Sequence, residues 1–346
     1  MKRTTISTLF HAATALSLML CLATAKGQTP IDSTLRRPHR PFFDNQHPSV
    51  HDPVMAWDEN GQCYIFHTGM GISCLSSTDM KNWHEEPSVF AQAPSWATSL
   101  IHGYHGHTWA PDITHIGNKW YLYYSCSTFG SNTSAIGLAI NKTLNRQSPD
   151  FGWEDKGLVI HSERGKNNWN AIDPALIIDR KGKPWLAFGS FWDGIQIVPL
   201  NSDMQTPKGT PRTIARRRNP EALRRHEGNS NAIEAPFIIH HQGYYYLFVS
   251  FDYCCRGLQS TYKTAVGRAR KVTGPYLDRE GKKMLDGGGT IIAGPDSEYA
   301  GIGHCGVYQH RGQWWFEAHG YDKARNGQSK LYLKPMHFED GWPVIK

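Results

Sequence analysis

Short apolar runs, separated by glycine turns and each preceded by a polar anchor, form the dominant pattern along this chain. The clearest copy places Glu234 before Ala235-Pro236, then an apolar run at 237–239, the turn residues Gln242-Gly243 and an aromatic and β-branched run at 244–249. This composition predicts two strands joined by a turn, with a carboxylate where the first strand begins. Taken alone, Glu234 could be a strand-edge charge left in water.

The same order of anchor, strand, glycine turn and strand occurs five times. The other copies begin at His51-Asp52-Pro53, Trp109-Ala110-Pro111, Ile172-Asp173-Pro174 and Gly303-His304-Cys305, the last without a proline. Aligned at Pro53, Pro111, Pro174, Pro236 and Gly306, the steps are 58, 63, 62 and 70 residues. A period of about 60 residues, built from short strands, fits a four-stranded antiparallel blade. The sequence therefore predicts an all-β fold, a five-bladed β-propeller, with leading strands near 54, 112, 175, 237 and 306 and no helix longer than about three turns.

Equivalent positions of the blades face a common axis in a propeller. Asp52, Asp173 and Glu234 each stand one or two residues before an anchor proline. We therefore expect these three carboxylates to converge at one end of the central channel. His304 takes the same place in the fifth copy and should point into the channel, although a buried, hydrogen-bonded core histidine is an alternative.

The N-terminus has the form of an export signal. Lys2-Arg3 precede an apolar run at 9–22 that ends in Ala23-Thr24-Ala25, which matches a secretory signal peptide. We predict a signal peptide at 1–25, a linker at 26–45, one propeller domain at 46–346, and periplasmic or extracellular residence. A lipid anchor at Cys21 is disfavoured by the bulky Leu20 before it, and no other segment could cross a membrane.

The charge and the missing motifs exclude several classes of function. The net charge of +7 is visibly concentrated at Arg216-Arg217-Arg218 and Arg224-Arg225-His226, which we interpret as a solvated loop. A nucleic-acid partner is not expected, because it would need a basic groove with stacking aromatics. The P-loop motif G-x-x-x-x-G-K-[ST], H-E-x-x-H and G-x-S-x-G do not occur in the sequence. Most of the six cysteines beyond the signal peptide are expected to be unpaired and buried.

Aromatic residues make up 12% of the chain, and Trp109, Trp169 and Trp192 fall where predicted strands meet loops. Sugar rings stack on aromatic side chains, and glycosidic cleavage needs one carboxylic acid and one carboxylate. Acids at an axial mouth ringed by aromatics therefore favour carbohydrate chemistry. Ordinary blade-core positions are the alternative for these tryptophans.

Motifs between about residues 48 and 343 together resemble glycoside hydrolase family 43, closest to its endo-1,5-α-L-arabinanases. They are His51-Asp52-Pro53, Trp109-Ala110-Pro111-Asp112-Ile113, the run 127–134, Asn170-Ala171-Ile172-Asp173-Pro174, Phe188-Gly189-Ser190-Phe191-Trp192, Ala232-Ile233-Glu234-Ala235-Pro236, Cys254-Cys255-Arg256-Gly257 and the runs 260–263, 273–276 and 287–290. No single motif is decisive, but their number and order make the match specific. The resemblance implies a five-bladed propeller, in agreement with the repeat count.

The resemblance also implies an inverting mechanism in which Asp52 is the general base and Glu234 the general acid. Asp173 would orient the acid and raise its pKa, because a negative neighbour makes loss of the proton harder. One calcium ion is implied in the channel, held by His304 largely through waters, and no organic cofactor is expected. The implied substrate-binding residues are Trp109, Phe129, Gly130, Asn170, Ala171, Ile172, Ser190, Phe191 and Trp192.

The implied activity is hydrolysis of internal α-1,5-L-arabinofuranosidic bonds in arabinan by an exported monomer. An exo-acting arabinofuranosidase or xylosidase of the same family would keep the three acids and differ in loops that block one end of the cleft. A non-catalytic carbohydrate-binding propeller would use the aromatics but has no need of three acids. Invertase-like propellers also use two Asp and one Glu, but the W-M-N-D-P-N-G type of sequence they favour is missing at His51-Asp52-Pro53.

Overall fold

The structure, a computed structural model, describes residues 43–217 and 231–346. The predicted signal peptide, most of the linker, Arg218 and Arg224-Arg225-His226 lie outside these residues. Strands dominate the described part, and its one α-helix is α1 (Ser95–Leu100). Three 3-10 turns accompany it: η1 (Gly257–Gln259), η2 (Met284–Asp286) and η3 (Lys323–Arg325). Within the described ranges no helix is long and apolar enough to span a membrane.

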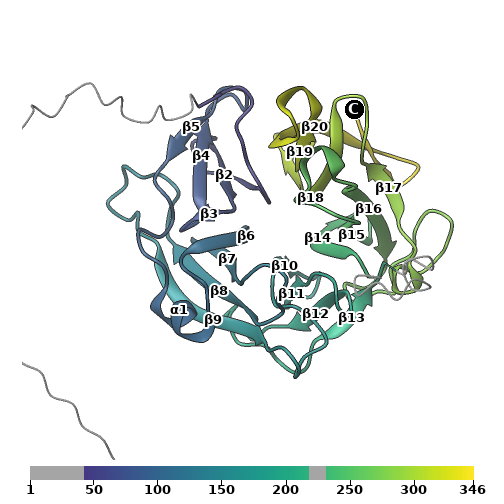
Figure 1. Ribbon diagram of the computed structural model, residues 1–346, viewed down its shortest axis with the longest axis horizontal. Helices are drawn as coiled ribbons and strands as arrows, with labels where there is room; N and C mark the ends of the chain where they lie inside the picture. The colour runs from purple at the N-terminus through teal and green to yellow at the C-terminus, as the bar shows by residue number, and fades with distance from the viewer. Residues whose placement is uncertain (1–42, 218–230) are drawn as a thin grey trace, which may run out of the picture. The chain divides into compact units, whose positions relative to one another are not determined.

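Five antiparallel sheets follow one another along the chain and surround a common axis (Figure 1). Blade 1 contains β1 (Val54–Trp57), β2 (Cys63–His67), β4 (Ser73–Ser77) and β5 (His84–Glu86). Blade 2 contains β6 (His107–Ile116), β7 (Lys119–Cys126), β8 (Ser134–Asn141) and β9 (Glu154–Ser162), with β3 (Gly69–Met70) added beside β6. Blade 3 contains β10 (Ala175–Ile178), β11 (Pro184–Phe188), β12 (Ile195–Pro199) and β13 (Arg212–Ala215). Blade 4 contains β14 (Ile233–His241), β15 (Tyr244–Phe251), β16 (Lys263–Ala269) and β17 (Thr290–Ala293). Blade 5 contains β18 (Tyr299–His310), β19 (Gln313–Asp322), β20 (Gln328–Glu339) and β21 (Trp342–Ile345).

The predicted five-bladed β-propeller is therefore confirmed. The strands β1, β6, β10, β14 and β18 lead the five blades, close to the predicted starts, and the labels of β6, β10, β14 and β18 lie toward the centre of Figure 1. The turn at Gln242-Gly243 joins β14 to β15, and both residues have positive φ angles of 46° and 79°. Two such residues form the tight hairpin turn whose twist matches that of the flanking strands.

Each sheet buries both of its faces against its two neighbours, which explains why the strands read as nearly continuous apolar runs. On β7, Tyr124 packs with Phe66 of blade 1, whereas the next residue back, Tyr123, packs with Phe188 of blade 3. Successive strand residues point to opposite faces, so one strand serves two cores. Similar clusters fill the interfaces of blades 3 and 4, 4 and 5, and 5 and 1.

The basic stretch differs in part from the predicted solvated loop. Arg216 forms an ion pair with Asp193 at 2.8 Å, and Arg217 pairs with Asp252 at 3.3 Å. Arg217 also lies over the ring of Phe251, with 4.5 Å between guanidinium carbon and ring centroid. Both arginine side chains are about three-quarters buried, so the prediction was wrong for these two residues. Arg217 ties the end of blade 3 to blade 4, whereas the ion pair of Arg216 lies within blade 3.

Each blade has one residue with a left-handed backbone conformation, either just before its leading strand or within it. The five residues and their φ angles are Asp52 (50°), Ala110 (44°), Asp173 (56°), Ala235 (54°) and His304 (53°). They directly precede Pro53, Pro111, Pro174, Pro236 and Cys305, so Cys305 rather than Gly306 takes the place of the proline in the fifth copy. Left-handed backbone is unfavourable for residues other than glycine and persists only where the surroundings impose it. We call these five residues the anchor positions.

A ring of hydrogen bonds holds the anchor positions. The backbone N–H of each one donates to a side chain of the preceding blade: Ala110 to Thr68 Oγ1 (2.9 Å), Asp173 to Ser125 Oγ (3.0 Å), Ala235 to Asp173 Oδ2 (3.2 Å), His304 to Ser250 Oγ (2.7 Å) and Asp52 to His319 Nδ1 (3.1 Å). The last bond joins blade 1 to blade 5 and closes the ring. The leading strands are therefore positioned relative to one another by polar bonds as well as by the apolar interfaces.

Removal of one hydroxyl from this ring should destabilise the protein. In Ser250→Ala the buried N–H of His304 loses its acceptor, which should lower the free energy of unfolding by about 1–3 kcal/mol. Urea unfolding followed by tryptophan fluorescence measures the change. Ser202→Ala, at an exposed turn residue, serves as the control, and equal midpoints for the two variants would contradict this role of Ser250.

Candidate active site

The anchor positions bring the three predicted carboxylates to the same end of the channel. Asp52 enters blade 1 and Asp173 enters blade 3, while Glu234 precedes the anchor position of blade 4 by one residue. Asp173 and Glu234 are 6% and 8% exposed, and the Asp52 side chain is 13% exposed. His304 enters blade 5, which lies between the blades of Glu234 and Asp52.

Asp52 is surrounded by donors. His304 Nδ1 lies 3.0 Å from Oδ1, and His51 Nδ1 lies 2.9 Å from Oδ2. Thr68 donates its hydroxyl proton to Oδ2 at 2.6 Å while it accepts the N–H of Ala110. Thr68 thus belongs both to the anchor ring and to the site.

The charges around Asp52 keep its carboxylate ionised. Burial would raise the pKa of Asp52, but the His51 and His304 imidazolium groups lower it well below its ordinary value. Burial opposes the charge of His304 in turn, but Asp52, and then Asp173 and Glu234, raise its pKa to about 9. At neutral pH the site therefore contains an ionised Asp52 beside a protonated His304.

A second layer of side chains orients His51. Its ring stacks on His319 with 4.0 Å between centroids, and its Nε2 lies 2.9 Å from the Tyr321 hydroxyl. His319 accepts the Asp52 N–H at Nδ1, so its proton is on Nε2, which donates to Tyr321 at 3.2 Å. Burial, with the nearby charges of His51 and His304, lowers the pKa of His319 well below its usual value. His319 is thus neutral, in agreement with this tautomer.

Glu234 and Asp173 form the other half of the site. Ser190 donates to Glu234 Oε2 at 2.9 Å, and Asp173 Oδ2 accepts the N–H of Ala235, next to Glu234. Ser190 lies just beyond β11 and has the same position in its repeat as Ser125 and Ser250. Its hydroxyl, however, donates to the carboxyl of Glu234 instead of accepting the N–H of an anchor residue. The pattern of the hydrogen-bond ring therefore differs between blades 3 and 4, where Asp173 and Glu234 lie.

Burial raises the pKa of both Glu234 and Asp173. For Asp173, the positive charge of His304 opposes this rise, while the negative charges of Glu234 and Asp52 add to it. Two neighbouring buried carboxyls cannot both ionise easily, so they titrate as a pair that keeps a proton. The Tyr262 hydroxyl is buried near Glu234 and has no aligned hydrogen-bond partner among the described residues. The arrangement suits a protonated Glu234 that can donate.

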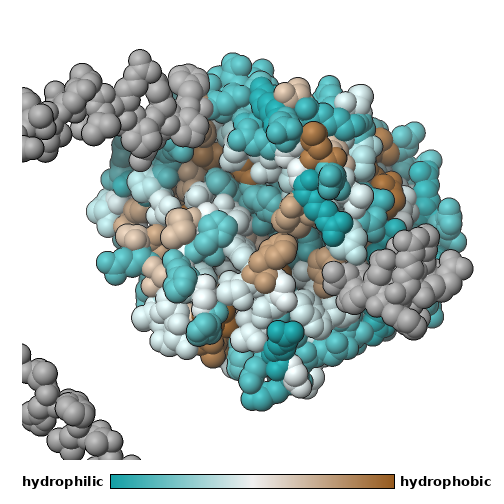
Figure 2. All heavy atoms as spheres, in the orientation of Figure 1, coloured by the Kyte–Doolittle hydropathy of each residue, from teal (hydrophilic) through white to brown (hydrophobic). Residues whose placement is uncertain are grey.

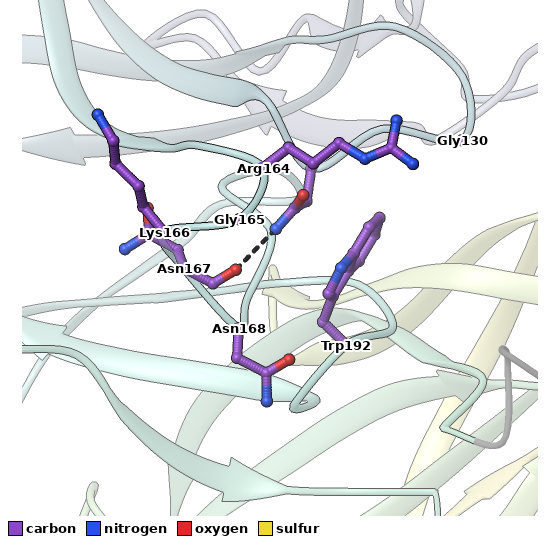
Figure 3. A pocket seen from close by; sticks show the side chains of 8 residues that line it. Gly130, Arg164, Gly165, Lys166, Asn167, Asn168 and Trp192 are labelled. Atoms are coloured by element: carbon purple, nitrogen blue, oxygen red, sulfur yellow. Dashed lines mark hydrogen bonds between the residues drawn. The ribbon is translucent and has the colours of Figure 1, made fainter.

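An open pocket of about 420 Å³ is formed by loops of blades 2 and 3. Its lining residues are Gly130, Asn132, Arg164, Gly165, Lys166, Asn167, Asn168 and Trp192. Figure 3 shows the Trp192 indole and the Arg164 side chain projecting from different parts of its wall. The Asn132 side-chain amide donates to the Asn167 backbone carbonyl at 2.9 Å. The face in Figure 2 is mostly hydrophilic, with apolar side chains near its middle. Gly130 and Trp192, both predicted to bind substrate, thus share one pocket.

The other residues predicted to bind substrate fall into two groups. Phe129 is 85% exposed, Phe191 lies against Tyr253 with ring centroids 6.0 Å apart, and Trp109 is half-buried with its indole N–H donated to His107. These side chains can reach a ligand. Ala171 is fully buried in the core between blades 2 and 3, and Ile172 is 8% exposed, so the Ala171 side chain is not available to a ligand in this structure.

Asn170 and Ser190 are buried polar residues at 3% exposure each. The Asn170 Oδ1 has no hydrogen-bond partner within the described ranges, so an acceptor remains open there. Trp169 packs edge-on against Phe188, which favours its core alternative.

Several residues of the site escaped the sequence analysis. Thr68, Ser125, Ser250 and His319 complete the anchor ring, and Tyr321 orients His51. The signal was present for the ring members, since Thr68, Ser125, Ser250 and His319 all lie near the end of the aromatic second strand of a repeat. Tyr321 carries no such signal.

Comparison with known proteins gives a consistent picture. The family model described as glycosyl hydrolases family 43 matches residues 39–343. An extracellular endo-α-(1→5)-L-arabinanase of Bacillus subtilis is 42% identical over 87% of this chain and 89% of its own length.

Two solved structures are similar over most of their length. An exo-1,5-α-L-arabinanase from a bovine ruminal metagenomic library is 57% identical, with a TM-score of 0.84 over 88% of this chain and 99% of that one. A Cellvibrio cellulosa α-L-arabinanase complexed with arabinohexaose is 43% identical, with a TM-score of 0.82 over 87% of this chain and 96% of that one.

The pairing of Asp173 with Glu234 predicts how the latter titrates. In Asp173→Asn the acceptor for the Ala235 N–H remains but a negative charge is lost, so Glu234 should ionise at lower pH. Carbon-13 NMR of protein labelled at the glutamate side-chain carboxyls, with Glu234→Gln to assign the signal, measures this pKa. Asp112→Asn, at another buried carboxyl, is the control, and a Glu234 pKa unchanged by Asp173→Asn would argue against the pair.

Proposed function

This chain belongs to glycosyl hydrolases family 43 and is a glycoside hydrolase that resembles the arabinanases of that family, and we propose that it hydrolyses α-1,5-linked L-arabinan with inversion. The observation that carries the proposal is the opposite protonation of two carboxyl groups at one channel mouth. Cations keep Asp52 ionised, whereas burial raises the pKa of Glu234, which forms with Asp173 a buried carboxyl pair that keeps a proton. An inverting glycosidase needs one carboxylate to activate water and one acid to protonate the leaving oxygen.

Asp52 acts as the general base. Its carboxylate accepts a proton from a water molecule as that water attacks the anomeric carbon. Thr68 and the two histidines fix the direction of its oxygens. Asp52 and Glu234 share no side-chain hydrogen-bond partner among the described residues and enter non-adjacent blades, which is compatible with the wide separation, roughly 6.5–9.5 Å, that leaves room for a water.

Glu234 acts as the general acid and protonates the departing oxygen. Ser190 holds Oε2, so Oε1 is the oxygen available to donate the proton. Asp173 is a positioning residue, because it accepts the backbone N–H next to Glu234 and opposes ionisation of the acid. As the proton leaves Glu234, the nearby positive charge of His304 stabilises the carboxylate that forms.

The substrate class rests on the similar proteins and on the pocket. A similar enzyme was solved with arabinohexaose, which supports an arabino-oligosaccharide as ligand. Trp192, Phe129 and Phe191 offer aromatic faces, and Asn170 offers an open acceptor. We place the sugar chain along the pocket of Gly130 and Trp192, next to the acids.

The place of cleavage along the chain has two candidates. Sequence resemblance favours internal cleavage, as in the Bacillus subtilis endo-arabinanase. Release from the chain end is favoured by the higher identity, 57%, to the exo-arabinanase from the ruminal library. Both use the same acids and differ in whether the cleft is open at both ends.

Product lengths separate the two modes. Internal cleavage of linear arabinan should give a ladder of oligosaccharides and an early fall in viscosity, whereas release from an end should give one short product with little change in viscosity. Timed chromatography of the digest measures both quantities. Hydrolysis of an aryl arabinofuranoside alone, with linear arabinan left intact, would contradict the proposal that the polymer is the substrate.

We also propose one hydrated calcium ion in the channel beside His304. With Nδ1 directed at Asp52, Nε2 is the nitrogen that can hydrogen-bond a water in the shell of the ion, and no protein partner for it is found in the described chain. Calcium prefers six to eight oxygen ligands, and one imidazole supplies none, so waters must complete the shell. Both oxygens of the buried Glu317 lack a described partner, and this carboxyl lies within the electrostatic reach of His304. The residues thus fit a hydrated cation, which would add positive charge near the three acids.

Removal of this ion should be measurable. Protein purified without chelator should contain about one calcium per chain, and dialysis against EDTA should remove it and lower activity, with recovery on addition of calcium. Elemental analysis beside activity assays tests both points. Full activity in metal-free protein would exclude the ion from the mechanism.

Export remains a proposal based on the N-terminal pattern at 1–25, and it is supported by the extracellular residence named for the Bacillus subtilis relative. Sequencing the N-terminus of protein recovered from outside the cytoplasm would test it. A mature chain that begins near Lys26 is expected.

The two catalytic carboxyls should respond differently to the leaving group. Asp52→Ala should lose at least a hundredfold in kcat/KM on both arabinan and an activated aryl arabinofuranoside, because the base is needed for either one. Glu234→Ala should lose as much on arabinan but recover in part on the aryl substrate, whose leaving group needs little protonation. Equal losses of Glu234→Ala on both substrates would reject its role as the acid.

A further inference from the structure

Two thiols lie beside the His51 imidazole, on the side away from Asp52, and these thiols take no part in the mechanism above. The side chains of His51, Cys254 and Cys255 place one nitrogen and two sulfur atoms within 4.8 Å of one another. Cys255 Sγ lies 3.7 Å from His51 Nε2, on the side of the ring away from Asp52. We propose that these three residues bind a thiophilic divalent metal ion of the Zn²⁺ class, at a site separate from the cation expected at His304.

The spacing of the donor atoms fits tetrahedral coordination. Zinc bonds of about 2.3 Å to sulfur and about 2.0–2.1 Å to nitrogen place a sulfur and a nitrogen ligand roughly 3.6 Å apart. The observed 3.7 Å between Cys255 Sγ and His51 Nε2 agrees with that value. The second sulfur needs only a small side-chain rotation, since it already lies within the 4.8 Å limit.

The backbone explains how two consecutive cysteines reach one point. Consecutive residues of an extended strand point to opposite sides. Cys255 instead has a left-handed backbone with φ of 62°, and its N–H donates to the Tyr321 hydroxyl at 2.6 Å. This bend, held by a residue of blade 5, brings both thiols to the side of His51.

The donors are also prepared chemically. A hydrogen bond with Cys254 and the neighbouring His51 lower the pKa of Cys255 to about 5, which favours the thiolate that binds metals. His51 directs Nδ1 at the Asp52 carboxylate at 2.9 Å, and its Nε2, which lies 2.9 Å from the Tyr321 hydroxyl, would exchange that contact for the metal. This is the carboxylate–histidine–metal arrangement that orients metal-binding histidines in many proteins.

The site is accessible and adjoins the reaction centre. Cys255 is exposed and Cys254 half-buried, so an ion can enter and a fourth position remains for water. A metal bound to His51 would replace an imidazolium that pairs with Asp52. Occupancy should therefore inhibit the hydrolysis; this consequence rests on the proposed function, whereas the binding itself does not.

Cobalt(II) is a direct probe of the binding, since it substitutes for zinc and gives a thiolate-to-metal absorption band. Wild-type protein, freed of metal and kept reduced with a phosphine, should develop this band with one equivalent of Co²⁺. Cys254→Ser and Cys255→Ser should each bind more than roughly tenfold more weakly, because even loss of an outer partner costs that much. Cys63→Ser, at a cysteine buried in the core between blades 5 and 1, is the control.

Absence of a thiolate band in the reduced wild type, or an undiminished band in Cys255→Ser, would overturn the metal site. Zn²⁺ should inhibit arabinan hydrolysis by the wild type at about the concentration at which it displaces Co²⁺, and Cys255→Ser should be correspondingly resistant. Binding without inhibition would reject the coupling to Asp52. If arabinan is not the substrate, the absorption titration still decides whether the metal binds.

Discussion

The five left-handed anchor residues, each tied through its N–H to the preceding blade, are the constraint on which the site depends. Such a conformation is costly for Asp52, Asp173 and His304, and a buried N–H without an acceptor adds to that cost. Hydroxyls at the ends of the second strands provide the acceptor at three boundaries, and His319 provides it where the ring closes. The side chains that start the leading strands are thereby fixed at the channel mouth.

The exception in this ring lies at the acids. Between blades 3 and 4 the acceptor is Asp173 itself, which frees Ser190 to bond Glu234. Asp173, which accepts the N–H of Ala235, therefore lies near the carboxyl of Glu234 in a buried environment. These two carboxyls together keep a proton. Across the channel, two histidines and Thr68 surround Asp52. The difference in protonation between the two sides thus arises from a local change in a repeated structural pattern.

Much of this arrangement could be predicted from the repeats. Proline-anchored copies of one size indicated five blades, and the acids before the prolines indicated which side chains meet. The contacts that orient Asp52 and His51 were not predicted, because His319 and Tyr321 reach these residues through the register of blade 5 against blade 1. Resemblance suggested substrate contact for Ser190 but not the hydrogen bond that its hydroxyl donates to Glu234. The paired Arg216 and Arg217 were taken for solvated side chains, because their acidic partners are distant in sequence.

The stereochemistry of the first product tests most directly whether Asp52 activates water while Glu234 protonates the leaving oxygen. Proton NMR of the nascent reducing end, recorded before mutarotation, distinguishes the two anomers. Direct attack by water on the face opposite the leaving group predicts a β-configured arabinofuranose. An α-configured product would require a covalent intermediate and would contradict this assignment of the two carboxyls while leaving the propeller unaffected.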